Sequence, residues 1–146
     1  MHDVPRKLTR EQLAELFEGD TRLVERLAER EDPLGSARDV IRELSEDEKL
    51  EALNAHPAIG ARNLSPRSAA EQGGDSDPAI LTELAYQNQI YEEKFGFRFV
   101  VFVNRRPKAE ILDVLRERIQ RTREEELDTA LEELVAIAED RWRSSS

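Results

Sequence analysis

Hydrophobic residues recur every three or four positions along most of this chain, which is the spacing of amphipathic helices. The clearest example follows Asp77, where these positions lie on one helical face: Ile80, Leu81, Leu84, Ala85, Asn88 and Tyr91. Asp77 and Pro78 suit the N-cap and the first helical position, and Gly96 suits the stop. The pattern therefore predicts a helix from Pro78 to about Gly96.

Start and stop signals divide the rest of the chain into further helices. They are "TREQLAELF" closed by Gly19, "TRLVERLAER", "ARDVIREL" capped by Ser36, "SEDEKLEALNA", a short helix within "SPRSAAEQGG", "PKAEILDVLRERI" and "EEELDTALEELVAIAEDRW". Ser45 with Glu48, and Thr122 with Glu125, have the spacing of a capping box. The chain has 146 residues, enough for one core, and no repeat or long linker. We expect an all-α single domain over residues 1–146, a bundle of about eight helices.

One segment departs from the helical pattern. "FRFVVFV", residues 97–103, favours a β-strand by propensity. A lone strand would have no partner in an otherwise helical chain. We therefore expect a buried extended segment here, or a helix imposed by tertiary packing.

Composition and charge narrow the possible partners and compartment. The chain has no cysteine, and no apolar run approaches the roughly 20 residues that span a bilayer. The N-terminal "MHDVPRKLTR" lacks the apolar stretch of a secretion signal. The formal net charge of −10 repels polyphosphates. We expect a cytoplasmic protein that binds neither membrane nor nucleic acid.

His56 is the first candidate for chemistry. The residue before a proline is pushed out of the helical region, so Pro57 ends the preceding helix near His56. An imidazole with an ordinary pKa of about 6.5 can act as acid or base near neutrality. The alternative is a helix-ending histidine that bonds a backbone carbonyl. Only two histidines occur in the chain, and neither has a ligand-spaced neighbour, so we expect no metal site.

A second cluster lies on the short helix expected within "SPRSAAEQGG". Ser68, Glu71 and Gln72 stand at i, i+3 and i+4, and so share one face. A hydroxyl, a carboxylate and an amide together suit a small polar ligand. Two other interpretations stay open, a solvated helix face and a capping box between Ser68 and Glu71.

Arg141 is the third candidate. Leu127, Leu134 and Arg141 are spaced seven apart, which places Arg141 on or beside the apolar stripe of the last helix. An arginine there either extends from the edge of the core into water or neutralises another group. Arg143 lies off that stripe, and we expect it at the surface.

Together these segments resemble one family, the decarboxylases of 2-oxo-4-hydroxy-4-carboxy-5-ureidoimidazoline (OHCU). The matching motifs are "HPAIG" at 56–60, "SAAEQ" at 68–72, "NQIYEEKFGFRFVV" at 88–101, "RERI" at 116–119 and "ELDTALEELVAIAEDR" at 126–141. They follow the family's order at close to its spacing. The resemblance covers about residues 40–143, and residues 1–39 match only loosely.

The resemblance implies a function for the whole chain. It implies an all-helical, homodimeric enzyme without a metal or an organic cofactor. The implied substrate is a small-molecule ureide, OHCU, converted to (S)-allantoin and CO2 in urate degradation. It also explains "FRFVVFV" as an extended segment that lines a pocket.

The resemblance further assigns individual residues. His56 matches the family's catalytic proton donor, and Glu71 matches its second essential side chain. The positions that match substrate-contacting residues are Pro57, Ser68, Ala69, Ala70, Glu71, Gln72, Phe99, Val100, Val101, Phe102, Val103 and Arg141. Phe102 and Val103 are bulkier than the small residues often found there. Substrate preference is unaffected by this difference if the segment contacts substrate through its backbone.

Two functions compete with this assignment. A related enzyme acting on another cyclic ureide would keep His56 and change the wall from Phe99 to Val103. A non-catalytic helical interaction module would explain the amphipathic helices and the acidic surface. A module predicts that His56 and the Ser68–Gln72 cluster are scattered on the surface.

Overall fold

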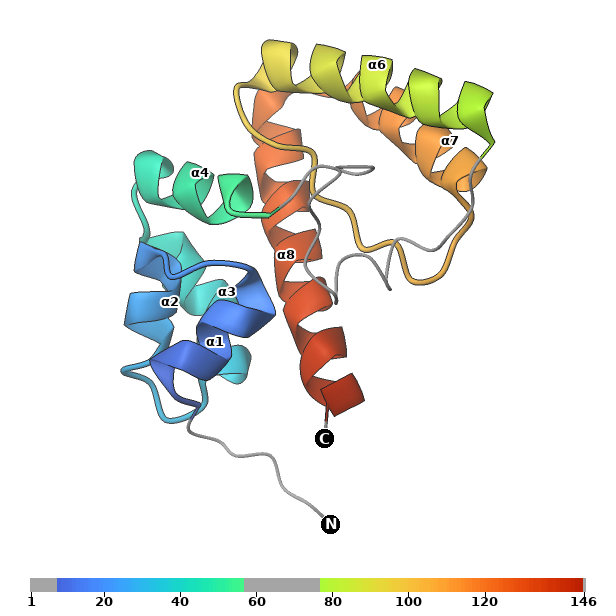
Figure 1. Cartoon of the computed structure of the whole chain (residues 1–146). Helices are drawn as coiled ribbons and strands as arrows, with labels where there is room; N and C mark the ends of the chain where they lie inside the picture. The colour runs from blue at the N-terminus through green and yellow to red at the C-terminus, as the bar shows by residue number, and fades with distance from the viewer. Residues whose placement is uncertain (1–7, 57–76, 146) are drawn as a thin grey trace. The chain divides into compact units, whose positions relative to one another are not determined.

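The computed structural model describes residues 8–56 and 77–145, and within these ranges the chain forms seven α-helices and no β-strand (Figure 1). The helices are α1 (Arg10–Phe17), α2 (Arg22–Leu27), α3 (Pro33–Glu43), α4 (Glu46–Asn54), α6 (Pro78–Phe95), α7 (Lys108–Arg118) and α8 (Arg123–Ser145). The all-α prediction is confirmed. The short helix expected within "SPRSAAEQGG" lies outside the described residues.

Local capping explains where several helices begin. Ser45 accepts a hydrogen bond from the Glu48 backbone N–H at 3.2 Å, and the Glu48 carboxylate accepts one from the Ser45 N–H at 3.0 Å. Thr122 and Glu125 make the same reciprocal pair at 3.1 and 3.0 Å. Both predicted capping boxes are confirmed. Each satisfies two backbone donors that the start of a helix leaves without partners.

The start of α3 corrects the prediction that Ser36 caps this helix. Asp32 is the N-cap, its carboxylate accepts a hydrogen bond from the Gly35 N–H at 3.2 Å, and Pro33 is the first helical residue. Ser36 therefore lies inside the helix. An aspartate followed by proline outcompetes the serine because the proline φ is already helical.

The end of α1 also differs from the prediction that Gly19 closes it. Glu18 is the residue that takes the left-handed conformation, with φ 63°. Gly19 serves another purpose, since a Cβ there would lie 3.0 Å from the Cβ of Ala55. The glycine permits a close approach to the end of α4.

One compact unit comprises residues 1–56 and 131–146. Its described part contains α1 to α4 and the C-terminal part of α8 (Figure 1). All of these helices contribute fully buried apolar side chains, among them Leu13, Leu23, Val24, Leu27, Val40, Leu53, Leu134, Val135 and Ala138. The amphipathic stripes read from the sequence thus form the core of this unit.

The other compact unit comprises residues 57–130. Its described part contains α6, α7, the first turns of α8 and an extended segment that joins α6 to α7 (Figure 1). The side chains of Phe97, Phe99, Val100, Val101 and Val103 are buried. The expected buried extended segment is confirmed. The prediction of a single domain over residues 1–146 stays a prediction.

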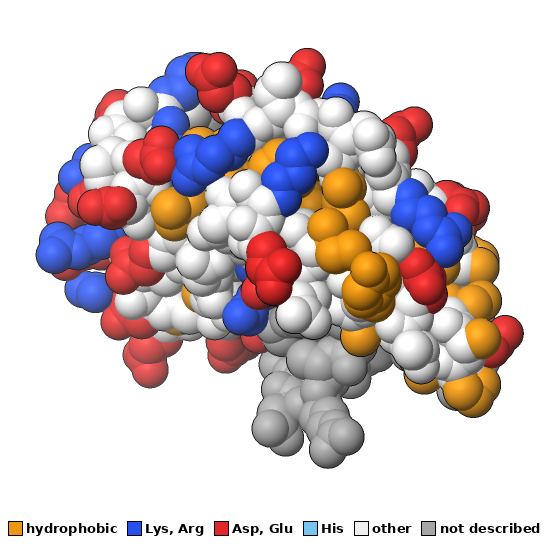
Figure 2. All heavy atoms as spheres, turned by 90° about the horizontal axis from the view of Figure 1, so that it is seen from above, with side chains coloured by type: hydrophobic (Ala, Val, Ile, Leu, Met, Phe, Trp, Pro, Cys, Tyr) orange, Lys and Arg blue, Asp and Glu red, His pale blue; other side chains and the backbone are white. Residues whose placement is uncertain are grey.

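Charged side chains of both signs are mixed over the face shown in Figure 2. Arginines such as Arg10 and Arg30 pair with Asp20 and Glu43 at 2.7 and 3.0 Å, and these pairs are largely exposed. Exposed pairs of this kind contribute about 0–1 kcal/mol each. None of the helices in the described part of the chain is long and apolar enough to cross a membrane.

Gly96 offers a test of how α6 ends. It is the C-cap with φ 82°, and a Cβ at this position would meet no atom within 4 Å. The cost of Gly96→Ala is therefore backbone strain alone, about 1–2 kcal/mol of unfolding free energy in urea denaturation. Gly96→Asn should cost less, because asparagine adopts the left-handed region more readily. Equal losses for the two variants would contradict this account.

Candidate active site

His56 lies at the end of α4, as the sequence predicts. Ala55 is the C-cap, and the His56 backbone N–H donates to the Leu53 carbonyl at 3.2 Å. The side chain is only 5% exposed. Pro57 follows directly, and its ring excludes a helical His56. The helix thus ends as the local sequence predicts, and a buried imidazole lies at its end.

Six of the predicted site residues lie outside the described residues: Pro57, Ser68, Ala69, Ala70, Glu71 and Gln72. Their assignments stay predictions. The described site residues fall in both units. His56 and Arg141 belong to the first, and the Phe99–Val103 segment belongs to the second.

Arg141 is buried in the first unit, with 2% of its surface exposed. Its Nη1 lies 3.0 Å from a Glu18 carboxylate oxygen and donates to the Leu16 carbonyl at 3.1 Å. Of the two interpretations left open, neutralisation is the one observed, and the group neutralised is the Glu18 carboxylate, whose side chain is 11% exposed. The guanidinium thereby ties the end of α1 to α8 within this unit. Arg143 is exposed, as expected.

The segment from Phe99 to Val103 is held by arginines at its carbonyls. Arg118 Nη1 donates to the Val100 carbonyl at 3.0 Å. Arg106 donates to the Phe102 carbonyl at 2.6 Å and to the Val103 carbonyl at 3.1 Å. A buried backbone without a neighbouring strand needs such partners, because an unpaired buried carbonyl is costly. Guanidinium groups thus replace the hydrogen bonds that a sheet would supply.

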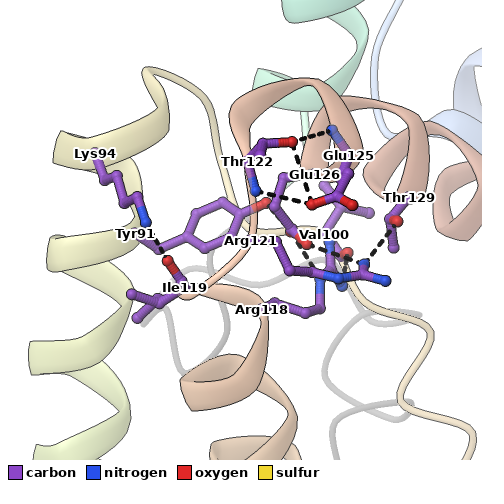
Figure 3. A network of polar contacts seen from close by, with 10 residues as sticks. All are labelled: Tyr91, Lys94, Val100, Arg118, Ile119, Arg121, Thr122, Glu125, Glu126 and Thr129. Carbon is purple, nitrogen blue, oxygen red and sulfur yellow. Dashed lines mark hydrogen bonds and ion pairs between the residues drawn. The ribbon is translucent and has the colours of Figure 1, made fainter.

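Glu126 is the centre of a buried polar network in the second unit (Figure 3). Its side chain is 0% exposed. One carboxylate oxygen accepts from the Tyr91 hydroxyl at 2.6 Å and from Arg118 Nε at 2.8 Å. The other oxygen accepts from Arg121 Nη1 at 3.3 Å. Burial, and then the Glu126 carboxylate, raise the pKa of Tyr91 above its ordinary value.

Aromatic rings connect this network to the segment. The Tyr91 ring centre lies 4.7 Å from that of Phe95 and 5.1 Å from that of Phe99. The Arg118 guanidinium lies over the Phe99 ring, 4.7 Å from its centre. Such contacts between cations and rings strengthen when water is excluded. The segment is therefore fixed at both its carbonyls and its rings.

Sequence reasoning assigned no role to Glu126, Arg118 or Arg106. A signal for the first was present, because Glu126 stands four and eight residues before Ala130 and Leu134, on the apolar stripe of the last helix. An acidic residue on such a stripe needs a buried cation as its partner. The described residues contain no group of three or more His, Cys, Asp or Glu residues that could hold a metal ion.

Comparison with known proteins identifies the family of this chain. Residues 2–143 match the family described as OHCU decarboxylase. The chain is 34% identical over 115 residues to the uric acid degradation bifunctional protein TTL of Arabidopsis thaliana, covering 71% of this chain and 36% of that protein. It is 32% identical over 103 residues to the OHCU decarboxylase of Halalkalicoccus jeotgali, covering 67% and 58%. The chain thus spans between about a third and three fifths of these relatives.

Two solved structures share the fold. A crystal structure of OHCU decarboxylase in the presence of (S)-allantoin superposes with a TM-score of 0.75 at 28% identity, over 89% of this chain and 94% of that one. A crystal structure of (S)-allantoin synthase gives 0.71 at 26% identity, over 92% and 48%. The chain belongs to the OHCU decarboxylase family.

Tyr91→Phe tests the buried network through its dependence on pH. Near neutrality the variant loses a hydrogen bond to a carboxylate, about 1.5–3 kcal/mol of unfolding free energy. The raised pKa keeps the folded phenol protonated, whereas the unfolded phenol ionises at its ordinary pKa of 10.0. The wild-type chain therefore loses stability as pH rises above that value, by about 1.4 kcal/mol per pH unit from this residue, and the variant does not.

Urea denaturation from about pH 9 to about pH 11 should thus show the gap between wild type and Tyr91→Phe narrowing. Tyr86, which is 59% exposed, supplies the matched control. Tyr86→Phe should stay within about 0.5 kcal/mol of wild type near neutrality. A gap that is constant or widens with pH would show that the Tyr91 phenol is not held protonated.

Arg141→Met tests the ion pair in the first unit. The change removes the guanidinium that offsets the mostly buried Glu18 carboxylate, and should cost about 3–5 kcal/mol of unfolding free energy. Adding Glu18→Gln should recover part of that loss, because the uncompensated charge is then gone. Arg143→Met, on the exposed face of the same helix, is the control and should change stability by less than about 1 kcal/mol. Equal effects of the two arginine variants would refute the assignment.

Proposed function

We propose that this chain is a cofactor-independent decarboxylase that converts OHCU to (S)-allantoin and CO2 in urate degradation. The observation that carries the proposal is the likeness to the OHCU decarboxylase crystallised in the presence of (S)-allantoin, which extends over 89% of this chain. The burial of His56 supports the same proposal, since a non-catalytic module predicts this residue at the surface.

The substrate's own chemistry explains why no cofactor is needed. One ring carbon carries a carboxylate and a hydroxyl, and its neighbour carries the ureido group and a C=N bond. When the bond to the carboxylate breaks, its electron pair forms a C=C bond, and the C=N pair moves to nitrogen, which takes a proton. The resulting enol loses its hydroxyl proton as the ureido-bearing carbon gains one. The ring itself is the electron sink that a cofactor otherwise supplies.

His56 is the group we assign to proton transfer. An imidazole can deliver a proton to the ureido-bearing carbon from one face, which fixes the handedness of allantoin. His56 lies just past the end of α4 and is buried. General acid–base catalysis of this kind contributes about 10²–10⁴-fold to a rate.

Glu71, Ser68 and Gln72 are the groups we assign to substrate orientation. The Glu71 carboxylate would bind the ring hydroxyl or the ureido N–H groups. Ser68 and Gln72 would bind the ring carbonyl and the ureido group. These roles follow from the family motif and from the chemistry of the side chains.

Arg141 has three candidate roles: it neutralises an anionic substrate, holds Glu71, or contacts a carbonyl. Its contact with Glu18 at 3.0 Å argues against the first, because a carboxylate already offsets much of the positive charge. A tight clamp on the substrate carboxylate would also stabilise the ground state and oppose decarboxylation. We therefore assign Arg141 to positioning.

The remaining proposals concern substrate, assembly and location. The bulky Phe102 favours the alternative of a related cyclic ureide only if its side chain faces the substrate. We also propose that the enzyme is a homodimer, as the family resemblance implies, and that it is located in the cytoplasm.

His56→Ala is the decisive variant. OHCU generated from urate with uricase and a hydrolase is supplied to the protein, and allantoin is followed by circular dichroism. The wild-type chain should yield optically active allantoin rapidly, and His56→Ala should lose about 10²–10⁴-fold in rate. His2→Ala removes the only other imidazole and should retain activity.

The spontaneous reaction in water gives the baseline for this assay. Racemic product at the background rate from the wild-type chain would reject the decarboxylase and redirect the search to other ureides. Full activity in His56→Ala would keep the enzyme and remove His56 from its mechanism.

A further inference from the structure

Arg118 makes three contacts, and Figure 3 shows two of them, those with Val100 and Glu126. Its Nη1 donates to the Val100 carbonyl at 3.0 Å, and its Nε donates to Glu126 at 2.8 Å. Its guanidinium plane lies over the Phe99 ring. Only the planar fork of arginine can bond two acceptors in different directions while it stacks on a ring.

The bond to Val100 determines the direction of a peptide group. In a planar trans peptide the carbonyl and the following N–H point in opposite directions. A Val100 carbonyl directed at Arg118 therefore directs the Val101 N–H away from it. The segment has no neighbouring strand in the described part of the chain to fix this orientation. The bond to Arg118 spans 18 residues, whereas Arg106 bonds carbonyls only three and four residues away.

Glu126 holds Arg118 in the orientation that reaches Val100. The carboxylate and the guanidinium are 0% and 5% exposed, so both groups have lost their water. A buried ion pair is often no more stabilising than apolar side chains of the same volume. The stability of the ion pair therefore does not explain why an arginine stands here. The bond to the Val100 carbonyl does, because an apolar side chain could not make it.

We propose that Arg118 is a positioning residue for the decarboxylation, because its bond to the Val100 carbonyl sets the orientation of the Phe99–Val103 segment at the substrate site. Glu126 acts through Arg118 in the same way. The inference rests on the proposed function, which makes this segment part of the substrate site. Neither residue is assigned a contact with the substrate.

The test compares Arg118→Lys with Arg121→Lys in the full chain. Each variant keeps a positive charge beside Glu126. Arg121 contacts Glu126 and Thr129 and is 43% exposed, and no contact with the segment is among its bonds. A lysine at 118 cannot bond Glu126 and the Val100 carbonyl in the same fork geometry.

The first measurement is independent of activity. The carbonyl ¹³C resonance of Val100 and the amide ¹⁵N resonance of Val101 report on the two sides of one peptide group. Both should shift in Arg118→Lys and stay in place in Arg121→Lys. Unchanged resonances in Arg118→Lys would overturn the proposal, because the bond would not set the segment's orientation.

The second measurement is kinetic, under conditions where urea denaturation shows that both variants are folded. Arg118→Lys should lower kcat/KM about tenfold, mostly through kcat, because misplaced contacts reduce transition-state stabilisation. Arg121→Lys should change it by less than about twofold. A general structural defect would instead appear as a lower unfolding free energy with normal kcat in the folded fraction.

The outcomes separate the two proposals. An active wild type with shifted Val100 resonances but normal kcat/KM in Arg118→Lys would overturn the positioning role alone. An inactive wild type would reject the proposed function, and the positioning role with it, whatever the resonances show. If Arg118→Lys does not fold, Glu126→Gln replaces it in both measurements, because it leaves Arg118 present and removes the carboxylate charge that holds it.

Discussion

The burial of one carboxylate, that of Glu126, is the constraint on which the second unit depends. A buried ion costs several kcal/mol unless nearby groups replace the lost water. Here the replacement comes from Tyr91 on α6 and Arg118 on α7, at 2.6 and 2.8 Å. Satisfying one charge therefore requires three helices to meet at one place. The same arginine then supports the Val100 carbonyl, so the extended segment is held by the network that joins the helices.

In the first unit, α8 also carries a buried charge, but of the opposite sign. Its buried charge is positive, Arg141 near the end of α8, and the groups that compensate it are the Glu18 carboxylate and the Leu16 carbonyl. Apolar contacts stabilise a helix pair without strongly favouring one register, whereas a hydrogen bond has a direction. In each unit a charged residue on the apolar stripe of α8 adds that direction. This directional role explains why α8 carries charged side chains whose burial has a desolvation cost that apolar side chains would not have.

Sequence reasoning succeeded mainly where one local signal decides the structure. The capping box at Ser45 was predictable because its partners lie three residues apart. The error at Ser36 was a choice between two local signals, and Asp32 was the stronger. Glu126 was missed for a different reason, since its partner Tyr91 is 35 residues away and no local pattern joins them. For His56, the sequence predicted the end of a helix but not the burial of the side chain.

The arginine contacts also bear on the bulky side chains of the segment that we propose contacts the substrate. The Phe102 carbonyl is bonded by Arg106 and the Val100 carbonyl by Arg118, so the path of this segment is set through its backbone. A backbone held in this way keeps its peptide orientation when the side chains along it change. Larger side chains at Phe102 and Val103 are then compatible with the family's fold. They alter the choice of substrate only if the side chains, rather than the peptide groups, face it.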